Sequence, residues 1–449
     1  MSKRILTAVL LLVILIVPMG VSLVSAQDDI VITWRTRPDN QAEIDVYTAL
    51  SNSIDERLEG ITLEYQAGGT ETAGYQATLL TEVAAGTAPD IFWIPGTDVA
   101  TFAGWDAAAG EFSEGAIANL AELAAADPDF DVNVFYSQQV EALTYDPTAM
   151  ASDVSTALWG LPRDASSFAL YTNLDLFEEA GIPTPAELLA EGNWNWETFT
   201  ETVVAIGELG DDVAGFGMNA WWANWWLFMN SAGGGYFNED RTQCGLNNEG
   251  TAAALQFLVD LYGTGEAVPF GTDSEPPFIA GNVGMFLNGR WATPNTVAQA
   301  EFNWDYAEVP AGPNGQSNWL FWGAYVVNVN SISDPERAAA VWEVLQELTS
   351  VESQSQVTAL GANLPSRAGE DAVAAFLNAE ITAGKNNEAF TNALANYAVA
   401  EQPLWAGNFG EYDAVASAEI TKVINGEISI EDFTAGICDQ LNPLLSSGM

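Results

Sequence analysis

Tryptophan is the residue type through which this sequence most clearly suggests chemistry, because the chain of 449 residues contains 16 of them. An indole ring offers an apolar face on which the C–H side of a sugar ring can lie, while polar groups at its rim hold the hydroxyls. This content is typical of a carbohydrate-contacting surface. The tryptophans that stand where a core rarely needs them are Trp221, Trp222, Trp225, Trp226, Trp291, Trp319, Trp322 and Trp405.

Four of these tryptophans lie in one run, 221–226, which reads WWANWW. If the run is helical, Trp221 and Trp225 share one face, because residues four apart are neighbours on a helix. Trp222 and Trp226 share another face for the same reason. One pair can then face a binding cleft while the other packs in the core; the alternative is that all four are packing residues. The candidate ligand contacts in this run are Trp221, Trp222, Asn224 and Trp225.

Two arginines, Arg35 and Arg37, follow the first expected strand in a chain that has 12 lysines and arginines in all. A guanidinium group can hold two neighbouring hydroxyls or a carboxylate in a planar fork. Both arginines are therefore candidate ligand contacts. A salt bridge to one of the 61 acidic residues is an equally simple role for each of them.

Several kinds of catalytic and metal site are excluded by what the chain lacks. It contains no histidine, which removes Ser-His and Cys-His nucleophile systems and histidine-ligated zinc. The run 127–131 starts like a calcium loop, but Val132 stands where an EF-hand needs glycine and Gln138 where it needs glutamate. No spacing among the carboxylates singles out an acid and a nucleophile for glycoside hydrolysis. We expect no catalytic residue, no metal and no cofactor.

The chain is strongly acidic, with a formal net charge of −49, although 16% of its residues are charged. The acidity therefore comes from missing bases rather than from a carboxylate-crowded surface. Such a chain should repel nucleic acid and anionic lipid. Its apolar share of 48% and aromatic share of 11% argue against disorder.

Residues 1–26 have the pattern of an export signal, with Lys3 and Arg4, an apolar stretch at 5–17 and small residues at 24–26. The stretch is too short to span a membrane, and an uncleaved N-terminal anchor is the alternative. Export to the periplasm or the exterior would permit a disulfide between the two cysteines, Cys244 and Cys438. The sequence leaves open whether they pair or stay as buried thiols.

Alternating strands and helices at the start of the chain predict an α/β domain with a mostly parallel sheet. The strands are expected at 30–33, 61–65 and 91–94, and the helices between them at 41–58 and 75–85. Farther along, a stub helix at 174–180 has Asn173 as a candidate N-cap and Gly181 as a left-handed stop. The rest is richer in helices, of which the clearest are expected at 196–209, 249–262 and 335–348.

The stretch 159–185, WGLPRDASSFALYTNLDLFEEAGIPTP, is followed at 193–199 by NWNWETF. Both resemble the middle signature of the maltose-binding-protein-like extracellular solute-binding proteins, which feed ABC importers. The resemblance covers nearly the whole mature chain, and its motifs occur in the family's order. The other motifs are TLLTEVAAGTAPDIFWI at 78–94, GGGYF at 233–237, EGTAAALQFLVDLY at 249–262, FIAGNVGMF at 278–286 and LPSR at 364–367.

The resemblance implies a periplasmic-binding-protein-like α/β fold with two lobes, each a mostly parallel sheet flanked by helices. The crossings between the lobes are expected near 163–167, 319–322 and 363–366. After a signal peptide at 1–26, the N-terminal lobe should comprise 27–163 and 323–363. The C-terminal lobe should comprise 164–322 and 364–449.

The resemblance also implies which segments line a cleft between the lobes. The loop after the strand at 91–94 contributes Trp93, Thr97 and Asp98, with Asp98 as the acceptor for a pair of sugar hydroxyls. Asp90, by contrast, is expected to anchor the loop. At the first crossing, Asp164 is a candidate contact, and a structural ion pair with Arg163 is its alternative. The remaining candidates are Trp291, Trp322, Gly323 and Trp405.

These expectations define an exported, monomeric protein that captures a mono- or oligosaccharide by hinge closure and delivers it to the membrane permease of an ABC importer. We expect no reaction, no binding to nucleic acid and no membrane span after removal of the signal. Two alternatives stay open. A secreted carbohydrate-active enzyme would turn its ligand over, and a binding protein of the same fold could take an acidic or amine-bearing solute.

Overall fold

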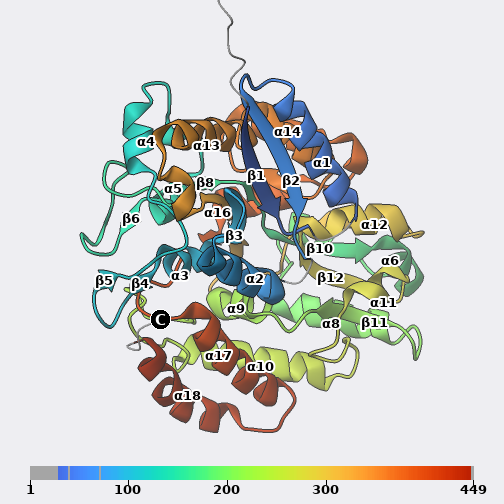
Figure 1. The fold of residues 1–449 in the computed structure, drawn as a ribbon. Coiled ribbons are helices and arrows are strands. Elements are labelled where there is room, and N and C mark those ends of the chain that lie inside the picture. Colours follow the sequence, from blue (N-terminus) through green and yellow to red (C-terminus); the bar gives the residue numbers. More distant parts are fainter. Residues whose placement is uncertain (1–28, 39–40, 70–71, 446–449) are drawn as a thin grey trace, which may run out of the picture.

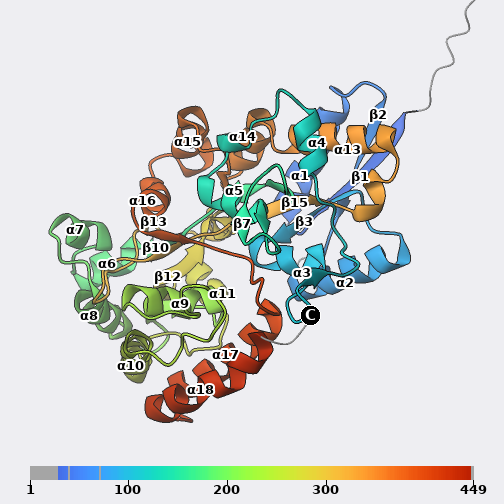
Figure 2. The same cartoon turned by 90° about the vertical axis from the view of Figure 1, so that its left-hand side faces the viewer.

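The computed structural model describes residues 29–38, 41–69 and 72–445 (Figure 1). The expected signal peptide at 1–26 lies outside these ranges. Within them, no helix is long and apolar enough to cross a membrane. Two sheets organise the described chain, one of five strands and one of four, and each is surrounded by helices in Figures 1 and 2.

The first sheet has the strand order β2-β1-β3-β15-β8. Its strands are β1 (Ile30–Thr36), β2 (Ile61–Ala67), β3 (Ile91–Pro95), β8 (Leu161–Pro162) and β15 (Gly323–Val327). β1 is parallel to β2 and β3, whereas β15 is antiparallel to β3 and β8. Gly323, where the chain re-enters this sheet, pairs with Pro95 at the end of β3, so β15 can only run back along it. β1, β2, β3 and β8 therefore run in one direction and β15 alone is reversed, so the sheet is mostly parallel, as the sequence predicted, with one antiparallel strand.

Helices and two hairpins complete this part of the molecule. The helices are α1 (Gln41–Asp55), α2 (Thr72–Ala85), α3 (Val99–Ala103), α4 (Ala121–Ala126), α5 (Ser137–Leu143), α13 (Pro335–Leu348) and α14 (Val351–Ala359), with short 3₁₀ turns η1 (Gly96–Asp98), η2 (Val132–Val134) and η4 (Val329–Ile332). The hairpins are β4 (Trp105–Asp106) with β5 (Glu111–Phe112), and β6 (Tyr145–Asp146) with β7 (Ala151–Ser152). Alternate residues of β1, such as Ile32 and Trp34, are fully buried in the core.

The second sheet has the order β11-β12-β10-β13. Its strands are β10 (Phe168–Asn173), β11 (Ala214–Met218), β12 (Val283–Gly289) and β13 (Trp304–Ala307). β10 is buried along its whole length and antiparallel to both neighbours. The side chain of Asn173 then caps α6 (Leu174–Ala180), and Gly181 ends that helix at a φ of 66°. The bounds and both ends of this helix confirm the sequence prediction.

Most of the remaining helices lie around the second sheet, whereas α15 (Glu370–Leu377) packs beside α14 (Figure 2). The other remaining helices are α7 (Pro185–Ala190), α8 (Trp196–Gly207), α9 (Trp222–Ser231), α10 (Glu249–Gly263), α11 (Glu275–Ile279), α12 (Thr293–Gln299), α16 (Glu388–Asn396), α17 (Phe409–Ile424) and α18 (Ile430–Leu445), with turns η3 (Arg290–Ala292) and η5 (Glu380–Thr382). A disulfide joins Cys244, in the loop after α9, to Cys438 of α18, with 5.3 Å between their Cα atoms. The two cysteines are therefore paired, a question that the sequence left open.

Three segments that connect the two sheets lie side by side. β9 (Asp164–Ala165) pairs with β16 (Leu364–Pro365). Ser166 and Phe321 exchange backbone hydrogen bonds of 2.9 and 2.8 Å. The predicted crossings are therefore confirmed as neighbours in one hydrogen-bonded set, the arrangement expected of a hinge. The lobe boundaries drawn through them stay a prediction.

We call the first sheet with its surrounding helices the first body, and the second sheet with its helices the second body. A further segment, 401–408, passes between these two bodies and is called the linker below. It follows β17 (Ala398–Ala400), which pairs with β14 (Asn318–Leu320), and leads into α17. In Figure 2 this part of the chain runs in red-brown from α16 across the molecule to α17. The indole of Trp105 in the first body donates a hydrogen bond of 2.7 Å to the carbonyl of Trp405, so the linker is attached to both bodies.

Candidate functional site

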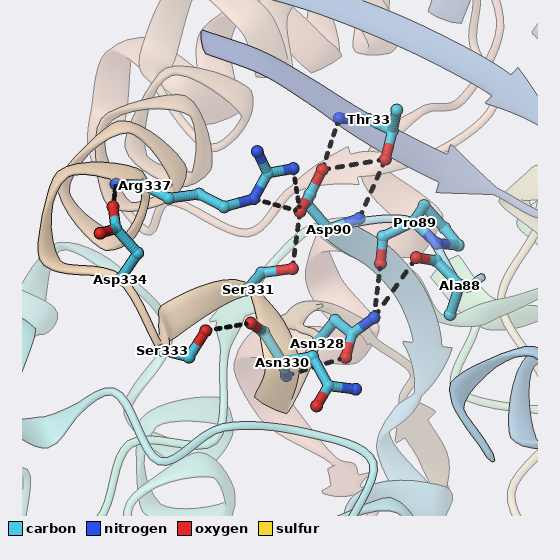
Figure 3. Close-up of polar contacts among 10 residues, drawn as sticks. All are labelled: Thr33, Ala88, Pro89, Asp90, Asn328, Asn330, Ser331, Ser333, Asp334 and Arg337. Atoms are coloured by element: carbon cyan, nitrogen blue, oxygen red, sulfur yellow. Dashed lines mark hydrogen bonds and ion pairs between the residues drawn. The ribbon is translucent and has the colours of Figure 1, made fainter. Parts of the chain in front are cut away.

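The carboxylate of Asp90 connects β1, η4 and α13 through hydrogen bonds (Figure 3). Its Oδ2 accepts hydrogen bonds from the backbone N–H and the hydroxyl of Thr33, at 2.9 and 3.0 Å. Its Oδ1 accepts from Ser331 Oγ at 2.6 Å and from the guanidinium of Arg337 at 2.7 Å. Figure 3 shows these groups converging on one carboxylate from β1, η4 and α13. Asp90 therefore has an anchoring role, but at the start of β3 rather than in the loop after that strand.

The loop that follows β3 brings Thr97 and Asp98 to the edge of the sheet where the chain crosses. The backbone N–H of Gly96 donates to the carbonyl of Trp322 at 3.1 Å. A Cβ at Gly96 would lie 2.5 Å from the Trp322 ring, so this approach requires glycine. The carboxylate of Asp98 accepts from the Gln76 amide and the Thr97 hydroxyl. Burial raises the pKa of Asp98 to about 7.

Trp93 lies between two guanidinium groups. The guanidinium carbons of Arg37 and Arg163 are 5.3 and 5.1 Å from its ring centroid, within the range of cation–π attraction. Among the described residues, its buried indole Nε1 has no hydrogen-bond partner. A Cβ at Gly323 would come within 1.9 Å of that nitrogen. Trp93, Arg37 and Gly323 are therefore neighbours, and their contact with a ligand stays a prediction.

Two other charged candidates are held in ion pairs. Arg35 Nη1 lies 2.6 Å from the carboxylate of Glu82, and its Nη2 donates to Gln66 at 2.8 Å. This is the salt-bridge alternative that the sequence left open for Arg35. Asp164 is paired with Arg163 and also accepts a hydrogen bond of 3.2 Å from the backbone N–H of Gly323. The contacts of Asp164 are thus those of a hinge pair.

On the other body, three aromatic side chains form a surface that we call the aromatic platform: Trp221, Trp291 and Phe321. The rings of Trp221 and Phe321 are stacked, with centroids 5.3 Å apart and an interplanar angle of 22°. Trp291 packs edge-on against both, at 6.0 Å from Trp221 and 5.3 Å from Phe321. Trp221 and Trp291 are half-buried rather than buried, so part of each ring is open to a ligand.

Arg290 fixes the position of Trp291. Its guanidinium is fully buried and donates hydrogen bonds to the Gly361 carbonyl at 2.8 Å, Asn387 Oδ1 at 2.8 Å and Thr382 Oγ1 at 3.0 Å. Gly361 directly precedes the third crossing, and Thr382 and Asn387 follow it. Burial lowers the pKa of Arg290, and each of its charged nitrogens has a polar partner. Arg290 therefore has a structural role next to the platform.

The run at 221–226 divides differently from the prediction, because α9 begins at Trp222 and Trp221 precedes it as an extended N-cap residue, so Trp221 and Trp225 do not form a pair. Trp222 and Trp226 do lie together, as predicted. Their ring centroids are 5.5 Å apart. Trp225 is 1% exposed and packs on Tyr236 in the core. Asn224 is also buried, and its amide donates to the Leu287 carbonyl at 3.4 Å. The site proposed below therefore leaves Asn224 and Trp225 out.

The two bodies meet at a cavity of about 10 Å³. This volume is about that of one water molecule. Thr97 lines it from the first body, and Trp222, Trp226 and Trp319 line it from the second. The remaining lining residues are Arg241, Glu401, Gln402 and Phe409.

Two of these lining residues are charged, and both have shifted pKa values. Burial raises the pKa of Glu401 to about 8, against smaller opposing effects of the Trp322 N–H and of Arg241. Burial likewise lowers the pKa of Arg241 to about 10. The Nη2 of Arg241 donates to the Gln402 carbonyl at 3.1 Å, which ties the loop after α9 to the linker.

The sequence analysis did not name Arg241, Glu401 and Gln402 of the cavity or Phe321 of the platform, and it noted Trp226 only as part of the run at 221–226. Arg241 could have been singled out because bases are so scarce in the chain. Glu401 carried no signal among 61 acidic residues. Two predicted candidates are differently placed: Trp322 is 3% exposed beneath Gly96, and Trp405 packs among Trp105, Tyr145 and Trp159 of the first body.

The arrangement suits binding of a neutral polar molecule. Half-exposed indole rings, hydroxyl and carboxyl groups and guanidinium groups are the contacts that hold a ring with apolar faces and a polar edge. Across the described ranges, no group of three or more His, Cys, Asp or Glu side chains is arranged to hold a metal ion.

Comparisons with known proteins agree with this geometry. Residues 43–355 match the model of a family described as bacterial extracellular solute-binding protein. A putative binding protein of Brucella abortus (strain 2308) is 29% identical over 208 residues, or 42% of this chain and 46% of that protein. The galactooligosaccharide-binding protein of Bacillus subtilis (strain 168) is 22% identical over 274 residues, or 57% of this chain and 55% of that protein. The chain thus spans about half the length of these curated relatives.

Solved structures extend the likeness over the whole fold. An ABC substrate-binding protein of Listeria monocytogenes, in complex with cycloalternan, is similar with a TM-score of 0.77 at 22% identity. The match covers 93% of this chain and 99% of that one, and it shows a shared two-lobe α/β fold. Together with the family match over residues 43–355, these findings show that the chain belongs to the bacterial extracellular solute-binding protein family.

Proposed function

We propose that this protein captures a mono- or oligosaccharide and delivers it to the membrane permease of an ABC importer. The observation that carries the proposal is the aromatic platform, where Trp221 and Trp291 are half-exposed and packed against Phe321. A sugar ring can lie on such a surface, because its C–H faces are apolar. The carbohydrate ligands named for the Bacillus and Listeria relatives support the same ligand class here.

Capture would proceed by hinge closure. The crossings at 163–167, 319–322 and 363–366 are the segments about which the lobes 27–163 with 323–363 and 164–322 with 364–449 would rotate. A ligand would first bind the platform, and the first lobe would then bring Trp93, Thr97 and Asp98 against it. The permease would recognise the closed, loaded form. We propose a monomer, exported to the periplasm or the exterior, that changes nothing in its ligand.

A ligand screen tests this proposal. The mature protein is heated with maltose, maltotriose, β-1,4-galactobiose, glucuronic acid, glycine betaine or no additive, and its melting temperature is followed. A ligand present at a hundred times its dissociation constant adds about 2.7 kcal/mol to the free energy of unfolding, which gives a clear upward shift. We expect a shift with at least one neutral sugar. A shift with the acid or the betaine alone would replace carbohydrate by a charged solute.

The same samples distinguish binding from catalysis. After prolonged incubation, chromatography of the sugars should return each one unchanged, with one equivalent bound per protein. Release of shorter sugars in excess of the protein concentration would identify a carbohydrate-active enzyme instead. Denatured protein serves as the control for spontaneous hydrolysis.

A further inference from the structure

We propose that Arg241 and Trp226 form, with Glu401, a subsite that selects one hydroxyl group of the ligand as the lobes close. The inference rests on the proposed carbohydrate-binding function and names the residues that would set its specificity. All three line the cavity where the two bodies meet. The aromatic platform would contact the apolar faces of the sugar ring, and this subsite would bind one of its hydroxyl groups.

Two of the residues that line this cavity each carry a hydrogen-bond donor that lacks a partner. Among the residues that the structure describes, Nε of Arg241 and Nε1 of Trp226 are buried and make no hydrogen bond. A buried donor without a partner destabilises the protein. Neighbouring indoles do not bear this cost, because Trp319 donates to the Ala223 carbonyl at 2.9 Å and Trp322 to the Glu401 carbonyl at 2.7 Å. The unpaired donors of Arg241 and Trp226 point to an acceptor supplied by a ligand.

Glu401 supplies the complementary acceptor. Within the described ranges no ion pair joins it to Arg241, although both line the same cavity. A hydroxyl fits this set because its oxygen accepts from the two N–H groups while its proton is donated to the carboxylate. A ligand carboxylate has no proton to donate to the oxygens of Glu401. A ligand ammonium could not accept from either donor and would face Arg241.

The size of the cavity agrees with this choice. About 10 Å³ admits a group the size of a water molecule, which is the size of a hydroxyl and not of a sugar ring. Thr97 closes the cavity from the opposite lobe. The subsite would therefore be complete only in the closed protein, and a ligand without the matching hydroxyl would leave the two donors unpaired on closure.

The backbone holds Arg241 in an uncommon position for this purpose. Its φ of 57° lies in the left-handed region that residues with a side chain rarely adopt. The loop is fixed on both sides, by the Asn238 carboxamide, which accepts from the N–H of Thr242 at 2.9 Å, and by the disulfide at Cys244. Strained residues of this kind persist where the surroundings over-determine them, often at ligand sites.

Calorimetric titration of the mature protein tests the inference. Wild type, Trp226→Phe and Arg241→Lys are titrated with maltose, maltotriose and β-1,4-galactobiose. Trp226→Phe keeps an aromatic ring and removes the N–H, and Arg241→Lys keeps the charge and removes Nε. We expect each variant to bind the tightest of these sugars at least about tenfold more weakly. Trp196→Phe is the matched control, because Trp196 Nε1 is also buried and unpaired but its ring lies on Phe257, 4.1 Å away and apart from this cavity.

Monodeoxy analogues of the tightest sugar identify the hydroxyl. For wild type, one deoxy analogue should bind more weakly than the parent sugar by about the factor that the Trp226→Phe substitution causes. For the Trp226→Phe variant, that same analogue should bind about as well as the parent sugar does. Equal losses in wild type and variant at every position would overturn the subsite. Unchanged affinity of both variants, with wild type binding a sugar, would overturn it as well while leaving the proposed function standing. Failure of wild type to bind any sugar would overturn both.

A variant that binds weakly because it is unfolded is recognised by its melting curve. If Arg241→Lys lowers the melting temperature by more than the Trp196→Phe control does, the deoxy-sugar comparison in Trp226→Phe decides the matter, because that substitution leaves the backbone of the 241 loop untouched.

Discussion

The indole of Trp322 donates a hydrogen bond of 2.7 Å to the backbone carbonyl of Glu401. This contact joins the second crossing to the linker 401–408. The Trp322 ring is also covered by Gly96 of the first lobe, whose N–H donates to the Trp322 carbonyl. Trp322 is itself part of the second crossing, and it contacts both the first lobe and the linker. Movement of the hinge must therefore change the surroundings of Trp322.

Trp322→Phe should therefore loosen this junction. It removes one buried hydrogen bond, worth about 0.5–1.5 kcal/mol of unfolding free energy, and leaves the Glu401 carbonyl without that donor. Urea unfolding of wild type and variant measures the difference. Trp342→Phe is the comparison, since Trp342 also loses an indole hydrogen bond, to Asp127, far from the hinge. We expect only Trp322→Phe to alter the change of tryptophan fluorescence on ligand addition; the same response in both variants would contradict a role at the hinge.

The platform gives a second prediction. Trp291→Ala should weaken binding of the tightest sugar by about 1–3 kcal/mol, the scale of removing a large apolar contact. Its stability should fall less than that of a core variant such as Trp225→Ala, because Trp291 is half-exposed and Trp225 is 1% exposed. Titration calorimetry gives the affinity and thermal unfolding gives the stability. An affinity equal to that of wild type would remove Trp291 from the site.

Titration of two carboxyl groups gives a third prediction. Burial raises the pKa of Asp98 to about 7 and that of Glu401 to about 8. In the unfolded chain both values return to about 4. Between pH 4 and 8 the folded protein therefore binds more protons than the unfolded chain, and its stability falls as the pH rises. Asp413, whose pKa is also raised by burial, acts in the same direction.

Urea unfolding at pH 5, 6, 7 and 8 measures this slope. The double variant Asp98→Asn with Glu401→Gln should show a flatter dependence, because its side chains no longer titrate. Glu347→Gln is the control, on an exposed surface pair with Arg57. A slope that is unchanged in the double variant would show that other groups cause the pH dependence.

The sequence predicted helix ends correctly where the ends are set by neighbouring residues in the chain. The bounds of α6 and of α13 are as predicted, because a side-chain cap starts each helix: Asn173 in one case and Asp334 in the other. The crossings were also placed correctly from ordered motifs. The resemblance also gave Asp90 an anchoring role, although the anchor lies at the start of β3 and not in the loop after it.

Contacts between distant segments could not be read in the same way. Glu401 and Arg241 meet at the cavity although nothing in either local sequence refers to the other. The spacing of WWANWW gave two helix faces, but α9 begins only at Trp222, and Tyr236 packs against both Trp225 and Trp226. The pairing of Cys244 with Cys438 depends on how α18 packs, over a sequence separation of 194 residues.

That disulfide gives a fourth prediction. It closes a long loop, and removing such a link from an exported protein typically costs about 2–5 kcal/mol. The double variant Cys244→Ser with Cys438→Ser should therefore melt at a lower temperature than wild type. Because the bond fixes the loop that carries Arg241, sugar affinity should fall as well. Wild type treated with dithiothreitol should reproduce both effects, and the variant should be insensitive to it.

The scarcity of basic residues gives the last prediction. Below pH 4 the carboxylates become protonated, and a chain with 12 lysines and arginines, two of them in the expected signal, is left with little positive charge. Acid unfolding driven by charge repulsion should therefore be weak. Salt adaptation is the rival explanation of the acidic composition, but it calls for a carboxylate-dense surface, and 16% of residues are charged. Circular dichroism from pH 3 to 8, at low salt and at about 1 M salt, where screening is nearly complete, separates the two. We expect a folded protein at low salt and at pH 4; folding that needs high salt would favour the rival, and loss of structure by pH 4 would contradict the charge argument.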